Sequence, residues 1–230
     1  MSKPAVSPEH ARMSIVVRTL SERVFEIVRE QIVTGQLPHD LPIRQDALAA
    51  ELGVSKIPLR EALARLEQEG LLTSQANRGY FVQPMSSAQA EEIFELRLAV
   101  EPVAAARAAR VATDADRRAA IESFERLDDA AEGNLAEVAM RNREFHTALV
   151  RPGDRILTTQ VVERLTILAE RYVIAHLAPA GRDERAHVEH RGLLDAWLAR
   201  DEATIMSMLS EHIAATLDDL RIEFAAAAAT

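Results

Sequence analysis

Apolar residues near the start of the chain recur at steps of three and four, the spacing that gathers them on one face of a helix. One such stripe runs from Leu20 to Ile32 and stops before Gly35, and a shorter one begins at Leu48 and stops at Gly53. Glycine commonly follows the last turn of a helix because it adopts the left-handed backbone conformation without strain. The pattern therefore predicts two helices, the second of them short.

A third stripe predicts the second half of a helix-turn-helix. It follows Ser55, a residue type that caps helix N-termini, runs from Leu59 to Leu66, and closes at Gly70. Two short helices separated by a turn that contains glycine form the helix-turn-helix pattern. After residue 70 the helical spacing of apolar residues ends, and a β-hairpin is expected.

The expected hairpin has strands at residues 71–74 and 80–82, with a turn at 75–79 between them. A hairpin directly after a helix-turn-helix is the wing of a winged helix. Segment 84–87 interrupts the pattern, and beyond it we find only helical spacing of apolar residues. Helix-breaking and capping residues divide this region into six predicted helices. The breaks fall at Thr113-Asp114, Gly133-Asn134, Pro152-Gly153, Pro179–Gly181 and Asp201.

The predicted fold is mainly α: an N-terminal winged helix-turn-helix of three helices plus a β-hairpin, followed by an all-α six-helix bundle. The expected divisions are a flexible arm at residues 1–12, the winged helix at 13–86 and the helical domain at 87–224. Residues 225–230 form an Ala-rich tail that has no face to bury and is expected to fray.

Composition narrows the possible classes of protein. The chain has no cysteine, which excludes disulfide frameworks, thiolate metal sites and cysteine nucleophiles and fits a reducing cytoplasm. No window approaches the roughly 18 consecutive apolar residues of a membrane span, and the first twenty residues lack a secretory core. We therefore expect a cytoplasmic protein without a membrane partner.

The net charge of −9 is unevenly distributed along the chain. Residues 1–86 carry 10 Lys+Arg and 10 Asp+Glu, so the remaining residues carry 17 against 26 and hold the whole excess. A charged side chain interacts strongly with a phosphate only within about a Debye length, ~8 Å at physiological salt. A domain with no net charge can therefore still bind DNA through a locally basic face. DNA binding by the front half thus remains open.

The start of the third helix offers candidate DNA contacts. Ser55, Lys56 and Arg60 lie where a recognition helix meets the major groove, in which Lys and Arg reach guanine acceptors and a hydroxyl holds phosphate. The alternative is that Ser55 only caps the helix, Arg60 pairs with a nearby carboxylate and Arg78 of the wing is simply solvated. Candidate contacts at the wing tip are Asn77, Arg78 and Gly79.

Three segments of the front half resemble GntR-type bacterial transcriptional regulators. They are GQL at 35–37, ALAAELGVSKIPLREALARLEQEGLL at 47–72 and NRGYFV at 77–82. The resemblance covers about residues 18–83 and implies a winged helix that binds double-stranded operator DNA. The chain departs from the usual family pattern at His39-Asp40, where Pro-Gly is common, and at Lys56-Ile57, where Arg-Thr is common.

A second constellation lies in the expected bundle. Asn142 and His146 are four residues apart and share a helix face, and His190 and His212 fall on the fifth and sixth bundle helices. If they converge, one oxygen and three imidazoles form a site for a divalent transition metal such as Zn, Ni or Mn. Histidines that are hydrogen-bonded within the core are the alternative, and spacing alone leaves both open.

The back half resembles the FCD-type effector domain found in the FadR branch of the GntR family. The similar segments are NREFH at 142–146, EHRGLLDAW at 189–197 and SEHI at 210–213. The resemblance implies that Asn142 and the three histidines named above hold the metal, whereas His176 and His187 fit no ligand position. Much of the family has Asp in place of Asn142, so a lower metal affinity is expected here.

The segment IFELRLAVEP at 93–102 resembles the first helix of that effector domain, whose arginine usually faces the ligand cavity. The resemblance implies that Arg97 binds the effector. The alternative is an ion pair with Glu101, one helical turn further on. Further cationic candidates are Arg143, Arg164 and Arg171.

Together these features predict a homodimeric, ligand-responsive transcriptional regulator, a repressor rather than an enzyme. Two recognition helices related by a twofold axis read an inverted repeat. Neutral imidazoles and an amide leave the charge of a metal ion uncompensated, so a small organic acid is the expected effector. The alternatives are a metal-dependent enzyme and a constitutive DNA-binding protein whose back half only dimerises.

Overall fold

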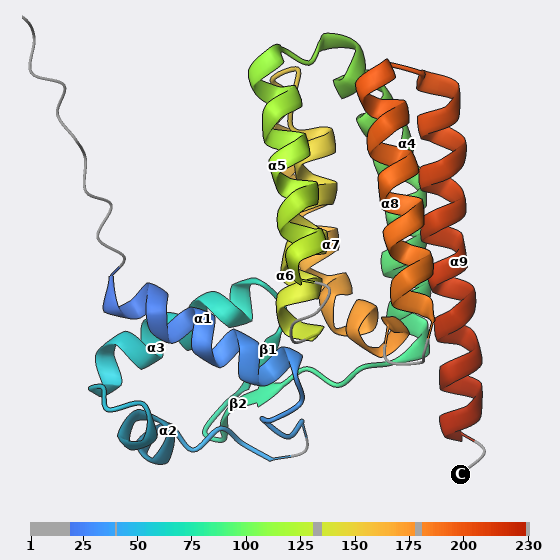
Figure 1. The fold of residues 1–230 in the computed structure, drawn as a ribbon. Coiled ribbons are helices and arrows are strands. Elements are labelled where there is room, and N and C mark those ends of the chain that lie inside the picture. Colours follow the sequence, from blue (N-terminus) through green and yellow to red (C-terminus); the bar gives the residue numbers. More distant parts are fainter. Residues whose placement is uncertain (1–18, 40, 131–134, 178–180, 229–230) are drawn as a thin grey trace, which may run out of the picture.

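The structure, a computed structural model, describes residues 19–39, 41–130, 135–177 and 181–228 of the chain. The expected arm at 1–12 lies outside these residues. A small domain of three helices and a hairpin packs at one end of an upright bundle of long helices (Figure 1). Among the described residues, no helix is both long and apolar enough to cross a bilayer.

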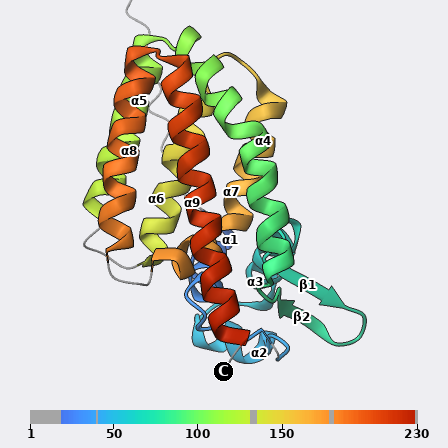
Figure 2. The same cartoon turned by 90° about the vertical axis from the view of Figure 1, so that its right-hand side faces the viewer.

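The front domain is the predicted winged helix. Its helices are α1 (Leu20–Val33), α2 (Gln45–Glu51) and α3 (Lys56–Gln68), and its strands are β1 (Leu72–Gln75) and β2 (Gly79–Val82). The strands are antiparallel, with Leu72 opposite Val82 and Gln75 opposite Gly79. The wing projects to one side below the end of the bundle (Figure 2).

The apolar stripes found in the sequence form the core of this domain. Thr19 and Glu22 cap α1 reciprocally, each side chain accepting a hydrogen bond from the other's backbone N–H. The buried faces of α1 and α3 then meet, and each fully buried aliphatic side chain contributes about 1.5–3 kcal/mol relative to exposure. Core side chains with no exposed surface are Val28, Ile32, Leu59, Leu63 and Leu66.

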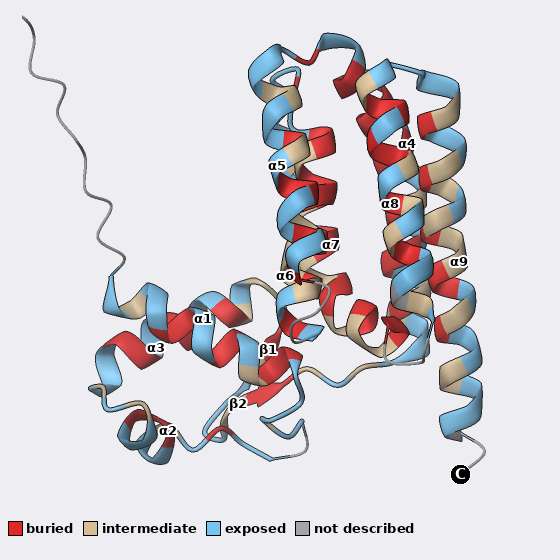
Figure 3. Ribbon diagram, in the orientation of Figure 1, coloured by how far each residue is buried: buried red, intermediate tan, exposed pale blue. Residues whose placement is uncertain are grey.

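The back domain is an all-α bundle of six helices within the described residues, as predicted. They are α4 (Ser87–Val111), α5 (Asp114–Ala130), α6 (Leu135–Val150), α7 (Ile156–Leu177), α8 (Arg182–Ala199) and α9 (Glu202–Ala228). Their buried faces point inward (Figure 3). Trp197 lies at the centre of the core, where its Nε1–H donates to the carbonyl of Leu149 at 3.0 Å.

Two expectations about helix ends differ from the structure. The fourth bundle helix begins at Ile156 rather than Asp154, because Asp154 has a φ of 53° in the left-handed region. The Ala-rich segment 225–228 continues α9 instead of fraying. Alanine has the highest helix propensity, and here it extends an already formed helix without a new nucleus. Residues 229–230 lie outside the described residues.

Helix α7 holds the winged helix against the bundle. Arg29 of α1 and Glu170 of α7 form a buried ion pair. Arg143 of α6 also contacts Glu170, with 3.0 Å between Nε and Oε1. The guanidinium of Arg171, the residue after Glu170, donates to the carbonyl of Gln83, just after the second strand of the wing. Charged groups therefore bridge both domains across a buried boundary.

The chain just after α3 approaches α7 closely at Gly70. Gly70 has a φ of 74°, and a Cβ atom on it would lie 3.0 Å from Leu168 and 3.1 Å from the guanidinium of Arg164. The hydroxyl of Tyr172 lies 3.3 Å from both the backbone nitrogen and the carbonyl oxygen of Ser86. Ser86 belongs to the linker between the two domains, residues 83–86. These contacts fix the linker on the same face of α7.

Candidate metal centre and nucleic-acid interface

The start of α3 presents its predicted DNA-contact residues to solvent. Ser55 occupies the N-cap position, but its side chain makes no capping hydrogen bond. Lys56 pairs with Asp46 at 2.5 Å, and both side chains are more than half exposed. Arg60 donates from Nε to the amide oxygen of Gln45 at 3.3 Å. Neither the expected cap nor an Arg60–carboxylate pair forms, so these polar groups remain available to a ligand.

A shallow hollow joins the starts of α2 and α3 to the wing. Lys56, Arg60, Arg78 and Gly79 line it, together with Arg44, which sequence reasoning missed. No motif marks Arg44, and only the packing of α2 against α3 brings it to this surface. A cluster of basic side chains at a recognition helix is suited to phosphate and base-edge contacts.

The wing tip is shaped by its turn. Asn77 has a φ of 61°, a left-handed conformation that Asn tolerates better than most residues. This turn leaves Asn77 and Arg78 exposed. The guanidinium of Arg78 lies 5.3 Å from the ring centroid of Phe81, close enough for a cation–π contact. The structure thus places all six sequence-predicted DNA residues at the helix start or the wing.

Three of the four predicted metal ligands converge inside the bundle. His146 on α6, His190 on α8 and His212 on α9 each offer a ring nitrogen within 4.8 Å of the others. The side chains of His146 and His212 are 1 % and 10 % exposed. Three imidazoles from three helices are therefore positioned to share one ion.

Asn142 is the fourth predicted ligand. It is buried one turn before His146 on α6, and it lines the same cavity as His190 and His212. Its side-chain oxygen is a suitable but uncharged ligand for a divalent ion. The donor set is then three imidazoles and one amide.

Two carboxylates orient the imidazoles of His146 and His212 by contacting their Nδ1 atoms. His146 Nδ1 lies 3.1 Å from Glu101 Oε2, and His212 Nδ1 lies 2.6 Å from Glu189 Oε2. The Nε2 atoms of His146 and His190 are buried without a hydrogen-bond partner. A carboxylate that fixes one ring nitrogen and leaves the other free is the usual support for a metal-binding histidine. The residues therefore fit a divalent transition metal.

The electrostatics keep the imidazoles in the form that binds metal. Burial lowers the pKa of His146 to about 4, against the opposing effect of Glu101, and burial also lowers the pKa of His190 well below 6.5. Neutral imidazoles offer a lone pair to a metal ion near neutral pH. The pKa of Glu101 is held well below 4.5, because the charge of Arg97 and the hydrogen bonds from His146 and Arg97 outweigh its burial.

Arg97 satisfies both interpretations of the sequence. It lines the cavity beside the histidines, as expected for an effector-binding residue. It also pairs with Glu101, with 2.6 Å between Nε and Oε1 and 3.3 Å between Nη2 and Oε2. The sequence identified Glu101 only as a partner for Arg97, one helical turn away, and not as a partner of His146. It did not identify Glu189, because the chain has 36 acidic residues and no spacing marks that one.

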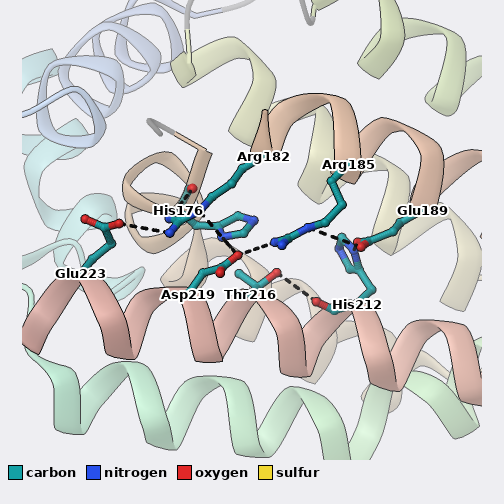
Figure 4. A network of polar contacts seen from close by, with 8 residues as sticks. All are labelled: His176, Arg182, Arg185, Glu189, His212, Thr216, Asp219 and Glu223. Atoms are coloured by element: carbon teal, nitrogen blue, oxygen red, sulfur yellow. Dashed lines mark hydrogen bonds and ion pairs between the residues drawn. The ribbon is translucent and has the colours of Figure 1, made fainter. Parts of the chain in front are cut away.

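A polar network extends from the histidines along α7, α8 and α9 (Figure 4). His176 Nδ1 lies 3.2 Å from Asp219 Oδ2, and Arg182 and Arg185 also contact that carboxylate. His176 lines the cavity but is not in the histidine cluster. His187 is 41 % exposed and pairs with Asp128.

The other cationic candidates serve the domain boundary and not the cavity. Arg143 pairs with Glu170, Arg171 bonds to the backbone of the linker, and Arg164 lies against Gly70. None of the three lines the cavity beside the histidines. Their role is therefore to hold the two domains together.

Two family models match the chain over these same regions. The model described as "Bacterial regulatory proteins, gntR family" matches residues 20–82, which include the helix-turn-helix and wing. The model described as "FCD domain" matches residues 92–215, which include the histidine cluster and more than half of the chain.

Two relatives match most of the chain. The HTH-type transcriptional regulator BphR of Paraburkholderia xenovorans (strain LB400) is 31% identical over 89% of this chain and 86% of its own length. The HTH-type transcriptional repressor GlaR of Escherichia coli (strain K12) is 31% identical over 82% of this chain and 90% of its own length. Both names describe regulators of transcription and not enzymes.

The fold is shared with a solved structure. Escherichia coli McbR/YncC matches 90% of this chain and 100% of its own chain, with a TM-score of 0.73 and 24% sequence identity. The similarity covers the front and back domains together.

Proposed function

This chain belongs to the GntR family of bacterial regulatory proteins and carries an FCD domain, and on that premise we propose that it is a homodimeric repressor controlled by a metal-bound carboxylate. The family assigns it to DNA-binding regulators that respond to a small-molecule effector. The proposal adds the metal, the chemical class of the effector, the dimer and the direction of regulation.

The convergence of His146, His190 and His212 carries this proposal. Two of their Nε2 atoms are buried and unpartnered, a state that costs free energy unless a ligand satisfies it. With Asn142, they would hold Zn, Ni or Mn, which when bound supplies positive charge and open coordination positions for a carboxylate. The cavity beside them, about 100 Å³, has room for such a ligand.

The basic hollow supports the DNA-binding end of the proposal. Lys56 and Arg60 are exposed on α3, and their present partners, Asp46 and Gln45, are themselves on the surface. Surface pairs of this kind contribute at most about 1 kcal/mol and exchange readily for phosphate or base contacts. Asn77 and Arg78 of the wing would add contacts to the DNA backbone.

Exposed apolar side chains on the bundle support a dimer. Large hydrophobic residues remain exposed along α4 and α7, which pack against each other. Burial of such a face against a second copy would place two recognition helices on one operator. The exposed side chains are Leu96, Val103 and Val111 on α4 and Ile156, Leu157 and Val161 on α7.

Metal binding is the test of the proposed site. Purified protein is incubated with Zn²⁺, dialysed, and analysed for metal content, and the affinity is measured by calorimetry. About one equivalent per chain is expected for the wild type and far less for His190→Ala, because that variant removes one of three imidazoles. His187→Ala is the matched control, since His187 lies on the same helix but is exposed and paired with Asp128.

Equal Zn²⁺ content in the wild type and His190→Ala would contradict the metal site. If the wild type binds no Zn²⁺, Ni²⁺ or Mn²⁺, the histidines are structural. The back half would then serve dimerisation alone.

A further inference from the structure

The cavity beside the histidines has two chemically different walls. One wall is polar and contains the candidate ligands Asn142, His190 and His212. The opposite wall is built from aliphatic and aromatic side chains of α5, α6, α7 and α8. Its members are Phe124, Leu127, Leu135, Val138, Val173, Leu177 and Ala186.

Positive charge in this cavity is confined to the histidine end. Among the described residues that line it, Arg97 is the one permanent cation, and Glu101 neutralises it through two contacts. Arg182 and Arg185 lie near His176 but are held by carboxylates, among them Asp219 (Figure 4). Arg191 stacks on the ring of Phe124, 4.1 Å from its centroid, but does not line the cavity. A negative group placed at the apolar wall would therefore find no permanent cation among the described residues that line it.

The charge near the histidines matches one carboxylate. A divalent ion would bring two positive charges to the neutral imidazoles and to Asn142. Glu101 offsets Arg97. Glu189 also contacts Arg185, but Asp219 and Glu223 together offset Arg182 and Arg185. Glu189, hydrogen-bonded to His212, is then left to offset half of the ion's charge. One positive charge then remains, which a single carboxylate neutralises.

The other polar residues that line the cavity, Thr216, His176 and His187, each have a partner. Thr216 donates its hydroxyl hydrogen to the carbonyl of His212, His176 lies beside Asp219, and His187 lies beside Asp128. The cavity volume is about 100 Å³. Since a water molecule needs about 10–15 Å³ on this measure, a ligand of about ten non-hydrogen atoms or fewer fits.

We infer that the cavity selects a monocarboxylate with an apolar body, a short aliphatic or aromatic acid, over dicarboxylates and polyhydroxy acids. This inference rests on the proposed metal site, which would hold the carboxylate. The apolar wall would contact the hydrocarbon part and exclude water from it. A second carboxylate, or several hydroxyls, would be desolvated against that wall without partners.

The test compares acids of similar size, all small enough for the cavity, on the Zn²⁺-loaded full-length protein. Calorimetry measures the dissociation constants of butyrate, benzoate, succinate and the four-carbon polyhydroxy acid threonate. Butyrate and benzoate are expected to bind at least tenfold more tightly than succinate or threonate. Equal or tighter binding of succinate would overturn the inference while leaving the metal-bound carboxylate of the proposed function intact.

A single substitution in the apolar wall provides the second measurement. Leu135 lines the cavity and is 38 % exposed, so a lysine there can lay its aliphatic stem along the apolar wall and hold its ammonium at the solvent-exposed edge of the cavity. Leu135→Lys is expected to shift the preference toward succinate at least fivefold relative to wild type. Leu135→Gln, similar in size and uncharged, is the control and should not shift it.

The outcomes separate the two proposals. Loss of all carboxylate binding in a protein that still binds Zn²⁺ would refute both the carboxylate effector and the inferred class. If Leu135→Lys and Leu135→Gln prefer succinate equally, charge at this wall does not set the selectivity, and the inference fails even if butyrate binds well.

Discussion

Arg60 is the residue through which the DNA-binding proposal is most directly tested. It is exposed on α3 and its hydrogen bond to Gln45 is long and at the surface. Arg60→Ala should weaken operator binding by about 1–3 kcal/mol, the range for a good base contact, and leave the unfolding temperature unchanged. A gel-shift titration at fixed salt on an operator selected from random DNA measures this.

The control for Arg60→Ala removes the same charge elsewhere. Arg118 is exposed on α5, and Arg118→Ala should bind the operator like wild type. Equal losses in the two variants would assign the effect to overall charge and not to a contact of α3.

Glu101 is a positioning residue at the proposed metal site, since it contacts His146 and Arg97 but does not itself line the cavity. Glu101→Gln should lower Zn²⁺ affinity about 10- to 100-fold, the usual effect of losing the carboxylate behind a ligating histidine. It should also destabilise the fold by about 3–5 kcal/mol, because Arg97 is left buried without its partner.

Competition with a chelator of known affinity measures the change in Zn²⁺ affinity. Urea unfolding without metal measures the change in unfolding free energy. Glu95→Gln is the matched control, because Glu95 lies on the same helix and is exposed. Unchanged Zn²⁺ affinity in a destabilised Glu101→Gln would show that Glu101 serves the core alone.

His176 links the stability of the bundle to pH. Burial lowers its pKa to about 4, although Asp219 opposes this, whereas an unfolded histidine titrates near 6.5. Between these values the unfolded chain binds the proton more readily, so this stabilisation is full above about pH 6.5 and is lost as the pH falls toward 4. The loss attributable to His176 is about 3 kcal/mol.

The measurement is urea unfolding in EDTA at pH 7 and pH 4.5, for wild type and His176→Gln. The difference in unfolding free energy between the two pH values should be smaller for His176→Gln by up to about 3 kcal/mol. An identical pH dependence would mean that His176 is already protonated in the folded protein.

At the scale of elements, the helices were predictable because helical periodicity is local. The stripe from Leu59 to Leu66 specifies α3 without knowledge of its neighbours, and the same holds for the six bundle helices. The start of α7 was not predictable to the residue, since Asp154 adopts a left-handed conformation that its side chain does not announce. The extension of α9 through the Ala-rich segment depended on the helix already formed before it.

The site was predictable only in part, for a geometric reason. Four-residue spacing places Asn142 and His146 on one face, but no spacing tells where α6, α8 and α9 approach one another. The family resemblance grouped the histidines, and the folded chain brings their nitrogens together. The Arg97–Glu101 pair followed from four-residue spacing, but the contacts of Glu101 with His146 and of Glu189 with His212 could not be predicted, because they join different helices.

Gly70 tests how tightly the end of α3 must approach α7. Gly70→Ala meets both a positive φ and close contacts with Leu168 and Arg164, whereas Gly53→Ala meets a φ of 63° but open space. Backbone strain alone should cost about 1–2 kcal/mol at either position. Gly70→Ala should therefore lose more unfolding free energy than Gly53→Ala in urea titrations, and equal losses would show that the contact with α7 relaxes freely.

At the scale of the whole molecule, Glu170 connects the two sites. It binds Arg29 of the winged helix and Arg143 of α6, the helix that carries Asn142 and His146. A ligand that moves α6 would shift Arg143 relative to Glu170. Because Glu170 also pairs with Arg29, the position of α1 against the bundle would change as well. Glu170→Gln should reduce the effect of Zn²⁺ plus butyrate on operator affinity toward onefold, from the usual allosteric range of about 5- to 150-fold.

Zn²⁺ affinity should be unchanged in Glu170→Gln, because Glu170 lies outside the histidine cluster. Fluorescence anisotropy of labelled operator, with and without Zn²⁺ and butyrate, measures the ratio of affinities. A wild-type ratio in the variant would place the coupling on another path, such as the contacts of Arg171 and Tyr172 with the linker.

The buried pair of Arg29 and Glu170 also limits how freely such regulators can be recombined. A chimera that joins this winged helix to the effector domain of a relative inherits Arg29 without a guaranteed carboxylate opposite it. An arginine buried without its partner costs several kcal/mol, so the hybrid would fold poorly even if both halves are sound. Such a chimera should fold when the new effector domain has a glutamate at the position of Glu170. It should also fold when Arg29 of the winged helix is replaced by methionine.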